Sequence, residues 1–251
     1  ELSAAAVRKR KAGEPVPQFT RAYAQDHLNS TSPFLQALFE RVLNEKFEPK
    51  LAWLLDDIAA LLNQVSVDAV FDSKRVHSEV SSDPVIHFYE PFLAAYDKEM
   101  KKARGVYYTP QPVVDFIVRA VHDALRTEFG LVDGLASTDT WGEVVKRYPT
   151  VALPRGLSES SPFVCILDPA TGTGTFLVTV VDTIFSTLKS RWDQEAKDVA
   201  SEWNAWVPNY LLPRLNAFEL MIASYAVAHL KMGLKLRELG YRPKAGERAN
   251  I

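Results

Sequence analysis

The stretch that most constrains the fold is residues 163–177, Phe-Val-Cys-Ile-Leu-Asp-Pro-Ala-Thr-Gly-Thr-Gly-Thr-Phe-Leu. Its first five residues are apolar and include two β-branched ones, which predicts a buried parallel strand. Asp168 and Pro169 end that strand, because proline has no N–H for the ladder. Gly172 and Gly174 then allow a tight turn with positive φ and close approach of a ligand.

The residues after this loop predict a helix that packs on the strand. Their apolar positions recur at helical spacing, at 177, 180, 181, 184 and 188. The order strand, glycine loop and helix N-terminus is one in which backbone N–H groups face a nucleotide-like ligand. A tight turn without any ligand is the alternative, because two glycines alone are a weak signal.

The residues around the glycines indicate what such a ligand carries. Asp168 repels a phosphate, but its carboxylate can accept hydrogen bonds from an ammonium group or from hydroxyls. Leu177 occupies the place of the third glycine in the dinucleotide-binding pattern. We therefore expect a ligand with a cation or hydroxyls and without a pyrophosphate.

A second informative stretch, Gly-Val-Tyr-Tyr-Thr-Pro-Gln-Pro, occupies residues 105–112. Thr109 is predicted to cap a helix, with Pro110 in its first position. The helix is expected to be apolar on one face and polar on the other. The apolar positions are Val113, Ile117, Ala120, Val121 and Ala124, opposite Asp115, Arg119, His122 and Arg126. Its N-terminal N–H groups suit a carboxylate, although an ordinary capped helix has the same features.

A third stretch, residues 215–220, predicts a short strand that ends in an acid, Glu219. An acid at the end of the second strand of a Rossmann-like unit can accept both ribose hydroxyls. Glu219 lies further from the glycine loop than the usual spacing of about 20 residues. A predicted tryptophan-rich helix over residues 191–209 explains that distance. A surface carboxylate is the alternative.

These three stretches resemble, in the same order, motifs of adenine-specific DNA methyltransferases in type I, type IIG and single-chain type ISP restriction–modification enzymes. Thr171 and Thr173 stand where cysteine and serine are frequent in that family. The resemblance implies that S-adenosyl-L-methionine is the cofactor. It assigns cofactor binding to Tyr108, Thr109, Pro110, Asp168, Pro169, Ala170, Gly172, Gly174, Thr175, Phe176, Glu219 and Leu220.

The resemblance covers roughly residues 84–240 and implies an α/β fold, mostly helical over this chain. We expect a helical N-terminal or linker domain over residues 1–97. Residues 98–251 are then the cofactor-binding half of a Rossmann-like methyltransferase domain. Helices are also predicted after Ser32-Pro33, from Pro49 and after Asp83-Pro84.

The catalytic Pro-Pro-aromatic loop of the family has no match in the sequence, so no catalytic residue and no metal ligand is assigned. The chain alone is predicted to be inactive, as the front part of an enzyme that methylates adenine in DNA. Its implied partners are DNA and restriction, helicase or specificity modules. A non-catalytic scaffold of a restriction complex and a nicotinamide-dependent oxidoreductase remain alternatives.

Composition adds few constraints. The net charge of −2 gives no basic footprint for nucleic acid. The single cysteine, Cys165, is expected in the core, and the absence of a long apolar run predicts a cytoplasmic protein without a membrane segment. Residues 131–161 are predicted to form a surface insertion with a short helix from Trp141 to Tyr148.

Overall fold

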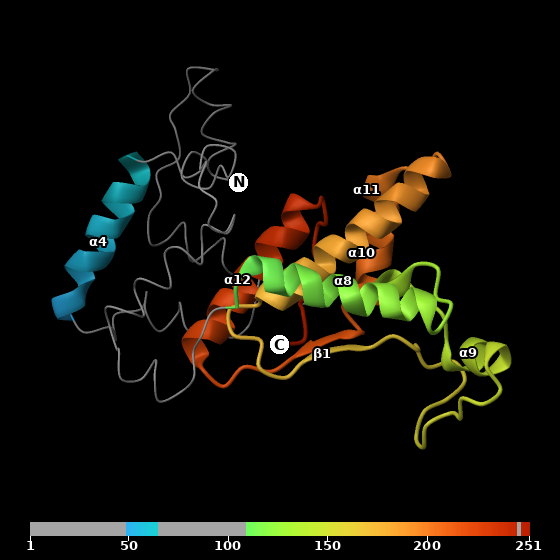
Figure 1. Cartoon of the computed structure of the whole chain (residues 1–251). Coiled ribbons are helices and arrows are strands. Elements are labelled where there is room, and N and C mark those ends of the chain that lie inside the picture. The colour runs from blue at the N-terminus through green and yellow to red at the C-terminus, as the bar shows by residue number, and fades with distance from the viewer. Residues whose placement is uncertain (1–48, 65–108, 245–246) are drawn as a thin grey trace. The chain divides into compact units, whose positions relative to one another are not determined.

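The structure is a computed structural model that describes residues 49–64, 109–244 and 247–251 (Figure 1). It divides into two units, residues 1–92 and 93–251, and each is described by itself. In the first unit the described element is α4 (Pro49–Gln64), which begins at the predicted proline. The helices predicted after Ser32 and after Asp83 lie outside the described residues. The boundary at residue 97 does too, and it stays a prediction.

The second unit is built mainly from helices and contains one small sheet (Figure 1). In chain order its elements are α8 (Gln111–Thr127), the 3₁₀-helix η1 (Gly134–Ala136), α9 (Trp141–Arg147), β1 (Ile166–Asp168), α10 (Thr175–Gln194), α11 (Val199–Trp206), the π-helix η2 (Val207–Leu211), β2 (Leu215–Ala217) and α12 (Ile222–Glu238). The described residues thus form a mostly helical structure with weak α/β character.

The sheet consists of β1 and β2, which pair in parallel. Ile166 lies opposite Leu215, and Asp168 lies opposite Ala217. Near the C-terminus, Asn250 forms a parallel bridge with Asn216. The parallel pairing is the part of the predicted α/β fold that is confirmed, whereas the Rossmann-like arrangement stays a prediction.

Helix α10 provides the largest part of the core. The five apolar positions predicted to face inward (Leu177, Val180, Val181, Ile184 and Leu188) are all buried. They belong to one apolar cluster with Trp192, Trp203 and Trp206. The helical structure predicted over residues 191–209 is confirmed except for a break, because the chain turns after Gln194 and α11 begins at Val199. The Asp198 side chain accepts the Ser201 N–H at 3.1 Å and so caps the new helix.

The strand β1 is buried on one face only. Val164 is buried, but Leu167 is 59% exposed and Cys165 is exposed. The predictions of a fully buried strand and of a core cysteine are therefore wrong. The reason is that side chains alternate along a strand, and the described helices cover the face of Ile166, not that of Leu167.

The buried face of α8 also differs from the prediction. Its buried residues are Val114, Val118 and His122, spaced four apart, whereas the predicted face is exposed, with Ile117 at 41% and Val121 at 47%. A histidine is accommodated in the buried stripe because His122 Nδ1 accepts the Leu135 N–H at 3.3 Å. Hydrophobicity alone therefore gave the wrong face.

The segment between α8 and β1 is more than a surface insertion. Leu135 and Ala136 belong to the main core, and Leu131, Val144 and Val164 form a second apolar cluster. The predicted short helix is confirmed as α9. The surface-insertion prediction is thus wrong for its first half, because η1 packs on α8 and α10.

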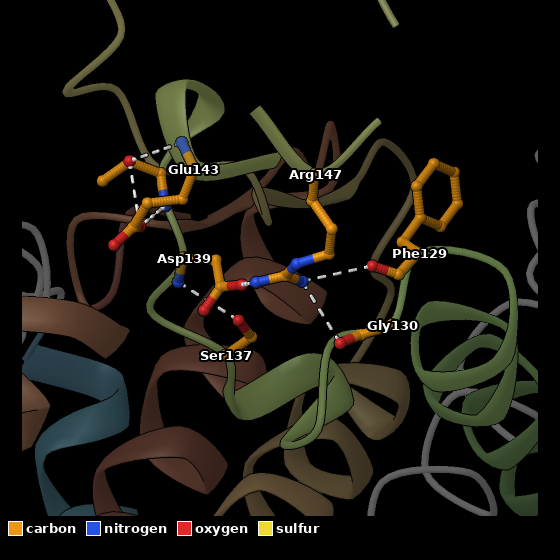
Figure 2. A network of polar contacts seen from close by, with 7 residues as sticks. Phe129, Gly130, Ser137, Asp139, Glu143 and Arg147 are labelled. Carbon is orange, nitrogen blue, oxygen red and sulfur yellow. Dashed lines mark hydrogen bonds and ion pairs between the residues drawn. The ribbon is translucent and has the colours of Figure 1, made fainter. Parts of the chain in front are cut away.

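Polar contacts hold this segment at both ends of α9 (Figure 2). The Thr140 hydroxyl accepts the Glu143 N–H, and the Glu143 carboxylate accepts the Thr140 N–H at 2.7 Å, which forms a capping box. Arg147 donates to the carbonyls of Phe129 and Gly130 and pairs with Asp139 at 2.8 Å.

Candidate functional site

The candidate site is the glycine loop between β1 and α10, where the two glycines are needed for different reasons. Both have positive φ, 57° at Gly172 and 80° at Gly174, a conformation that glycine adopts without cost. A Cβ on Gly174 would lie 3.2 Å from the Ala228 Cβ, whereas nothing lies within 4 Å of one on Gly172. Gly174 therefore lets α12 approach the loop closely, and Gly172 serves the turn.

Most backbone N–H groups of the loop already donate to protein oxygens. Those of Thr171 and Gly174 donate to the carbonyls of Phe218 and Thr171, at 3.0 and 2.9 Å. The N–H of Gly172 donates to Glu219 Oε2 at 2.8 Å, and that of Ala170 donates to Asp168 Oδ1 at 3.3 Å. A phosphate-binding loop needs free N–H groups directed at the ligand, so this loop is poorly suited to a phosphate.

Asp168 carries a buried acceptor that can take a hydrogen bond from a ligand. Its Oδ2 is buried and has no hydrogen-bond partner among the described residues. The same is true of the Thr171 hydroxyl in the loop. A buried acceptor without a donor costs about 1–3 kcal/mol, and more for a charged group. An ammonium or hydroxyl group on a ligand would remove that cost at Asp168.

Glu219 lies two residues after β2 and contacts the loop across the sheet. Its Oε2 accepts the Gly172 N–H at 2.8 Å, and its Oε1 accepts the Met221 N–H at 2.7 Å. The structure thus brings Glu219 and the glycine loop together, 47 residues apart in sequence. Each carboxylate oxygen has a second lone pair, so the group retains capacity for ligand hydroxyls.

The sequence interpretation missed two residues of α12, the helix behind the loop, that contact it. Ala228 of α12 contacts Gly174, and Lys231, one turn later, donates from Nζ to the Thr175 hydroxyl at 3.3 Å. Lys231 is only 4% exposed. The signal for this role was available, because a small residue and a lysine three positions apart share one helix face.

The start of α8 corrects the predicted cap. The residue before the helix is Pro110, and no side chain caps it, so Thr109 is not the N-cap. Pro112 takes the proline position in the first turn. Gln111 instead links the helices, because its side chain donates to the Thr179 hydroxyl of α10 at 3.0 Å. The Thr-Pro stretch and the helix after the glycine loop are therefore neighbours.

The remaining predicted cofactor residues have varied settings. Pro169 and Ala170 are exposed, and Leu220 is 94% exposed. Thr175 begins α10, and Phe176 is partly buried against the core. Tyr108 lies outside the described residues. Cofactor binding by all of these residues stays a prediction.

Among residues 49–64, 109–244 and 247–251, no three His, Cys, Asp or Glu side chains are grouped so that they could hold a metal ion. No helix of the same ranges is long and apolar enough to span a membrane.

One protein-family profile matches part of the chain. The profile of the N-6 DNA Methylase family matches residues 80–137. The predicted recognition is confirmed for this part of the chain, which includes the Thr-Pro stretch but not the glycine loop. No curated protein matches the chain.

One solved structure that resembles the chain is a nuclease-deletion mutant of the Type ISP restriction-modification enzyme LlaGI in complex with a DNA substrate mimic. The two sequences are 22% identical, and the TM-score is 0.36. The match covers 95% of this chain and 22% of the LlaGI chain, so this chain spans about a fifth of that enzyme.

Proposed function

From the partial N-6 DNA methylase domain in this chain, we infer that the glycine loop binds S-adenosyl-L-methionine. The observation that carries this proposal is the loop's hydrogen-bond pattern. Most of its N–H groups donate to protein oxygens, while a buried carboxylate oxygen of Asp168 has no donor among the described residues. A ligand with an ammonium group and hydroxyls fits this pattern, and one with a pyrophosphate does not.

The proposed contacts follow the chemistry of each group. Asp168 accepts from the ammonium group of the methionine part, and Glu219 accepts from the ribose hydroxyls. The N–H groups of Val113 and Val114 already donate to the Pro110 carbonyl, so α8 would favour the carboxylate end through the positive end of its dipole. Gln111 supports this arrangement, because its bond to Thr179 holds α8 beside α10. The bound cofactor supplies an activated methyl group on a sulfonium.

We propose further that the whole protein methylates the exocyclic amine of adenine in DNA as part of a restriction–modification system. An enzyme that acts on a base removes it from the stack and holds it by hydrogen bonds and aromatic stacking. The sequence contains no Pro-Pro-aromatic loop for that purpose. The 251-residue chain is therefore expected to leave DNA unlabelled when it is incubated with tritiated S-adenosyl-L-methionine. Label on adenine would show that a catalytic loop has been overlooked.

Two alternatives remain, and a binding experiment alone distinguishes one of them from the proposed function. A nicotinamide oxidoreductase requires NAD binding at the loop, which the occupied amides disfavour. A non-catalytic scaffold of a restriction complex shares the cofactor site and differs only in lacking methyl transfer by the whole protein.

Isothermal titration of the 251-residue chain with S-adenosylhomocysteine and with NAD tests the proposal. We expect binding of the former and none of the latter. Asp168→Ala should abolish or strongly weaken that binding, whereas the matched control Asp193→Ala, at an exposed ion pair with Lys189, should not. Binding of NAD alone, or equal affinity of the two variants, would contradict the proposal.

A further inference from the structure

We propose that Glu219 is a positioning residue that holds the glycine loop in its turn before any ligand binds. This role is separate from a contact with ribose. Only its consequence for cofactor affinity rests on the proposed function. The hydrogen bonds between the ends of β1 and β2 support this role.

The parallel ladder continues beyond both strands into the loop. The Phe218 N–H donates to the Asp168 carbonyl at 2.9 Å, and the Thr171 N–H donates back to the Phe218 carbonyl at 3.0 Å. One residue later the backbone turns to positive φ at Gly172. The Gly172 N–H then donates to the side chain of Glu219, at 2.8 Å. A side-chain carboxylate, and not a backbone carbonyl, thus accepts the N–H at the point where the loop turns.

The second oxygen fixes the carboxylate itself. Glu219 Oε1 accepts the Met221 N–H at 2.7 Å, which ties the side chain to the residue that precedes α12. The side chain is partly buried. With one oxygen bonded to each segment, the carboxylate joins the β1–α10 loop to the start of α12. Hydrogen bonds to charged groups are the stronger kind.

The sterics of Gly172 make this bond important. A Cβ on Gly172 would meet nothing within 4 Å, so packing does not define the turn there. Gly174, in contrast, is fixed against Ala228. We infer that the first half of the loop depends on the Glu219 carboxylate and the second half on α12.

Amide hydrogen exchange measured by NMR on the ligand-free chain tests this role. In Glu219→Ala the amides of both Gly172 and Met221 should exchange faster, by roughly 10- to 150-fold where exchange reports local opening. Glu219→Gln keeps one acceptor oxygen, so it should protect only one of the two amides. That partial rescue distinguishes a specific acceptor from a general loss of stability.

The matched control is Glu143→Ala, which removes a carboxylate that also accepts a backbone N–H at 2.7 Å. It should accelerate exchange at Thr140 and leave Gly172 unchanged. Unchanged exchange at Gly172 in both Glu219 variants would overturn the positioning role. Equal acceleration of all loop and core amides would overturn it as well, because it would indicate global unfolding.

Titration of the same variants with S-adenosylhomocysteine separates this inference from the proposed function. Faster Gly172 exchange in a Glu219→Ala chain that binds like wild type would support the positioning role and contradict the ribose contact. Unchanged Gly172 exchange together with weakened binding would contradict the positioning role and support the ribose contact.

Discussion

Two glutamates of this protein make similar hydrogen bonds in two different regions. Glu143 lies in the segment between α8 and β1, and its carboxylate accepts the Thr140 N–H at 2.7 Å (Figure 2). Glu219 lies after β2, and its carboxylate accepts the N–H groups of Met221 and Gly172, at 2.7 and 2.8 Å. The bonds of Glu143 stay within one helix turn, whereas one bond of Glu219 connects residues 47 apart.

The surroundings of the two carboxylates differ more than their bonds. Near Glu143, the charged group of Arg147 is matched by Asp139 and two carbonyls. Near Glu219, Asp168 Oδ2 is buried without a partner among the described residues. A region whose polar groups are satisfied is explained by structure alone, but an unpaired buried acceptor requires another account. This difference is the reason why we place the ligand at the second region.

The largest expected effect is on cofactor affinity. Glu219→Ala removes a charged acceptor worth about 1.5–3 kcal/mol, so S-adenosylhomocysteine should bind roughly 10- to 150-fold more weakly. Glu143→Ala should leave the affinity unchanged. Isothermal titration of the two variants measures the contrast, and equal affinities would remove the functional difference between the two regions.

The next effect concerns the two loop glycines and the free energy of unfolding. Alanine with positive φ costs about 1–2 kcal/mol, which is the loss expected for Gly172→Ala. Gly174→Ala should cost more, because its Cβ would also lie 3.2 Å from that of Ala228. Urea denaturation gives both values. A larger loss at Gly172 would show that α12 does not fix the second half of the loop.

A smaller effect is expected when Glu143 is replaced, and on stability only. Loss of a helix N-cap interaction typically costs about 1 kcal/mol, so Glu143→Ala should lower the urea midpoint slightly. Thr140→Ala should do the same, because the two residues form one capping box. If the losses in free energy of unfolding of the two single variants add up in the double variant, the capping box is not a cooperative unit.

The smallest effect is a dependence of stability on pH at the junction of α8 and η1. Burial, and secondarily Arg126, lowers the pKa of His122 below its ordinary value of 6.5. Between the lowered pKa and pH 6.5, His122 is therefore protonated in the unfolded chain and neutral in the folded chain. Stability should be complete above about pH 6.5 and decrease as the pH falls from there toward the lowered pKa.

Urea midpoints at pH 7.5 and 5.5 measure this dependence, and His122→Gln should reduce it. His229 contributes in the same direction, because burial also lowers its pKa. The His122 variant should therefore keep part of the slope. An unchanged slope would assign the whole effect to other groups.

The sequence predicted the site region better than the packing around it. The glycine loop, the inward face of α10 and the acid after β2 follow from local patterns, and the structure contains all three elements. The buried face of α8 could not be predicted in this way, because Val113 and Val114 are equally apolar. The choice depends on η1, whose Leu135 N–H bonds His122.

Two other features depend on contacts that no local pattern encodes. Thr109 has the residue type of a cap, but Pro110 takes that position and Gln111 bonds to α10. The bond from Gly172 to Glu219 requires the register of β1 with β2. A sequence gives the residue types at a site, and the tertiary structure decides which of their atoms remain available.

The measurement that tests the central claim most directly is an NMR titration of the ¹⁵N-labelled 251-residue chain with S-adenosylhomocysteine. We expect the largest amide shifts at residues 168–176 and 219–221, with small changes at residues 139–147. NAD at the same concentrations should leave the loop signals unchanged. Shifts outside the loop alone, or an equal response to NAD, would contradict a loop that binds S-adenosyl-L-methionine through Asp168 and Glu219.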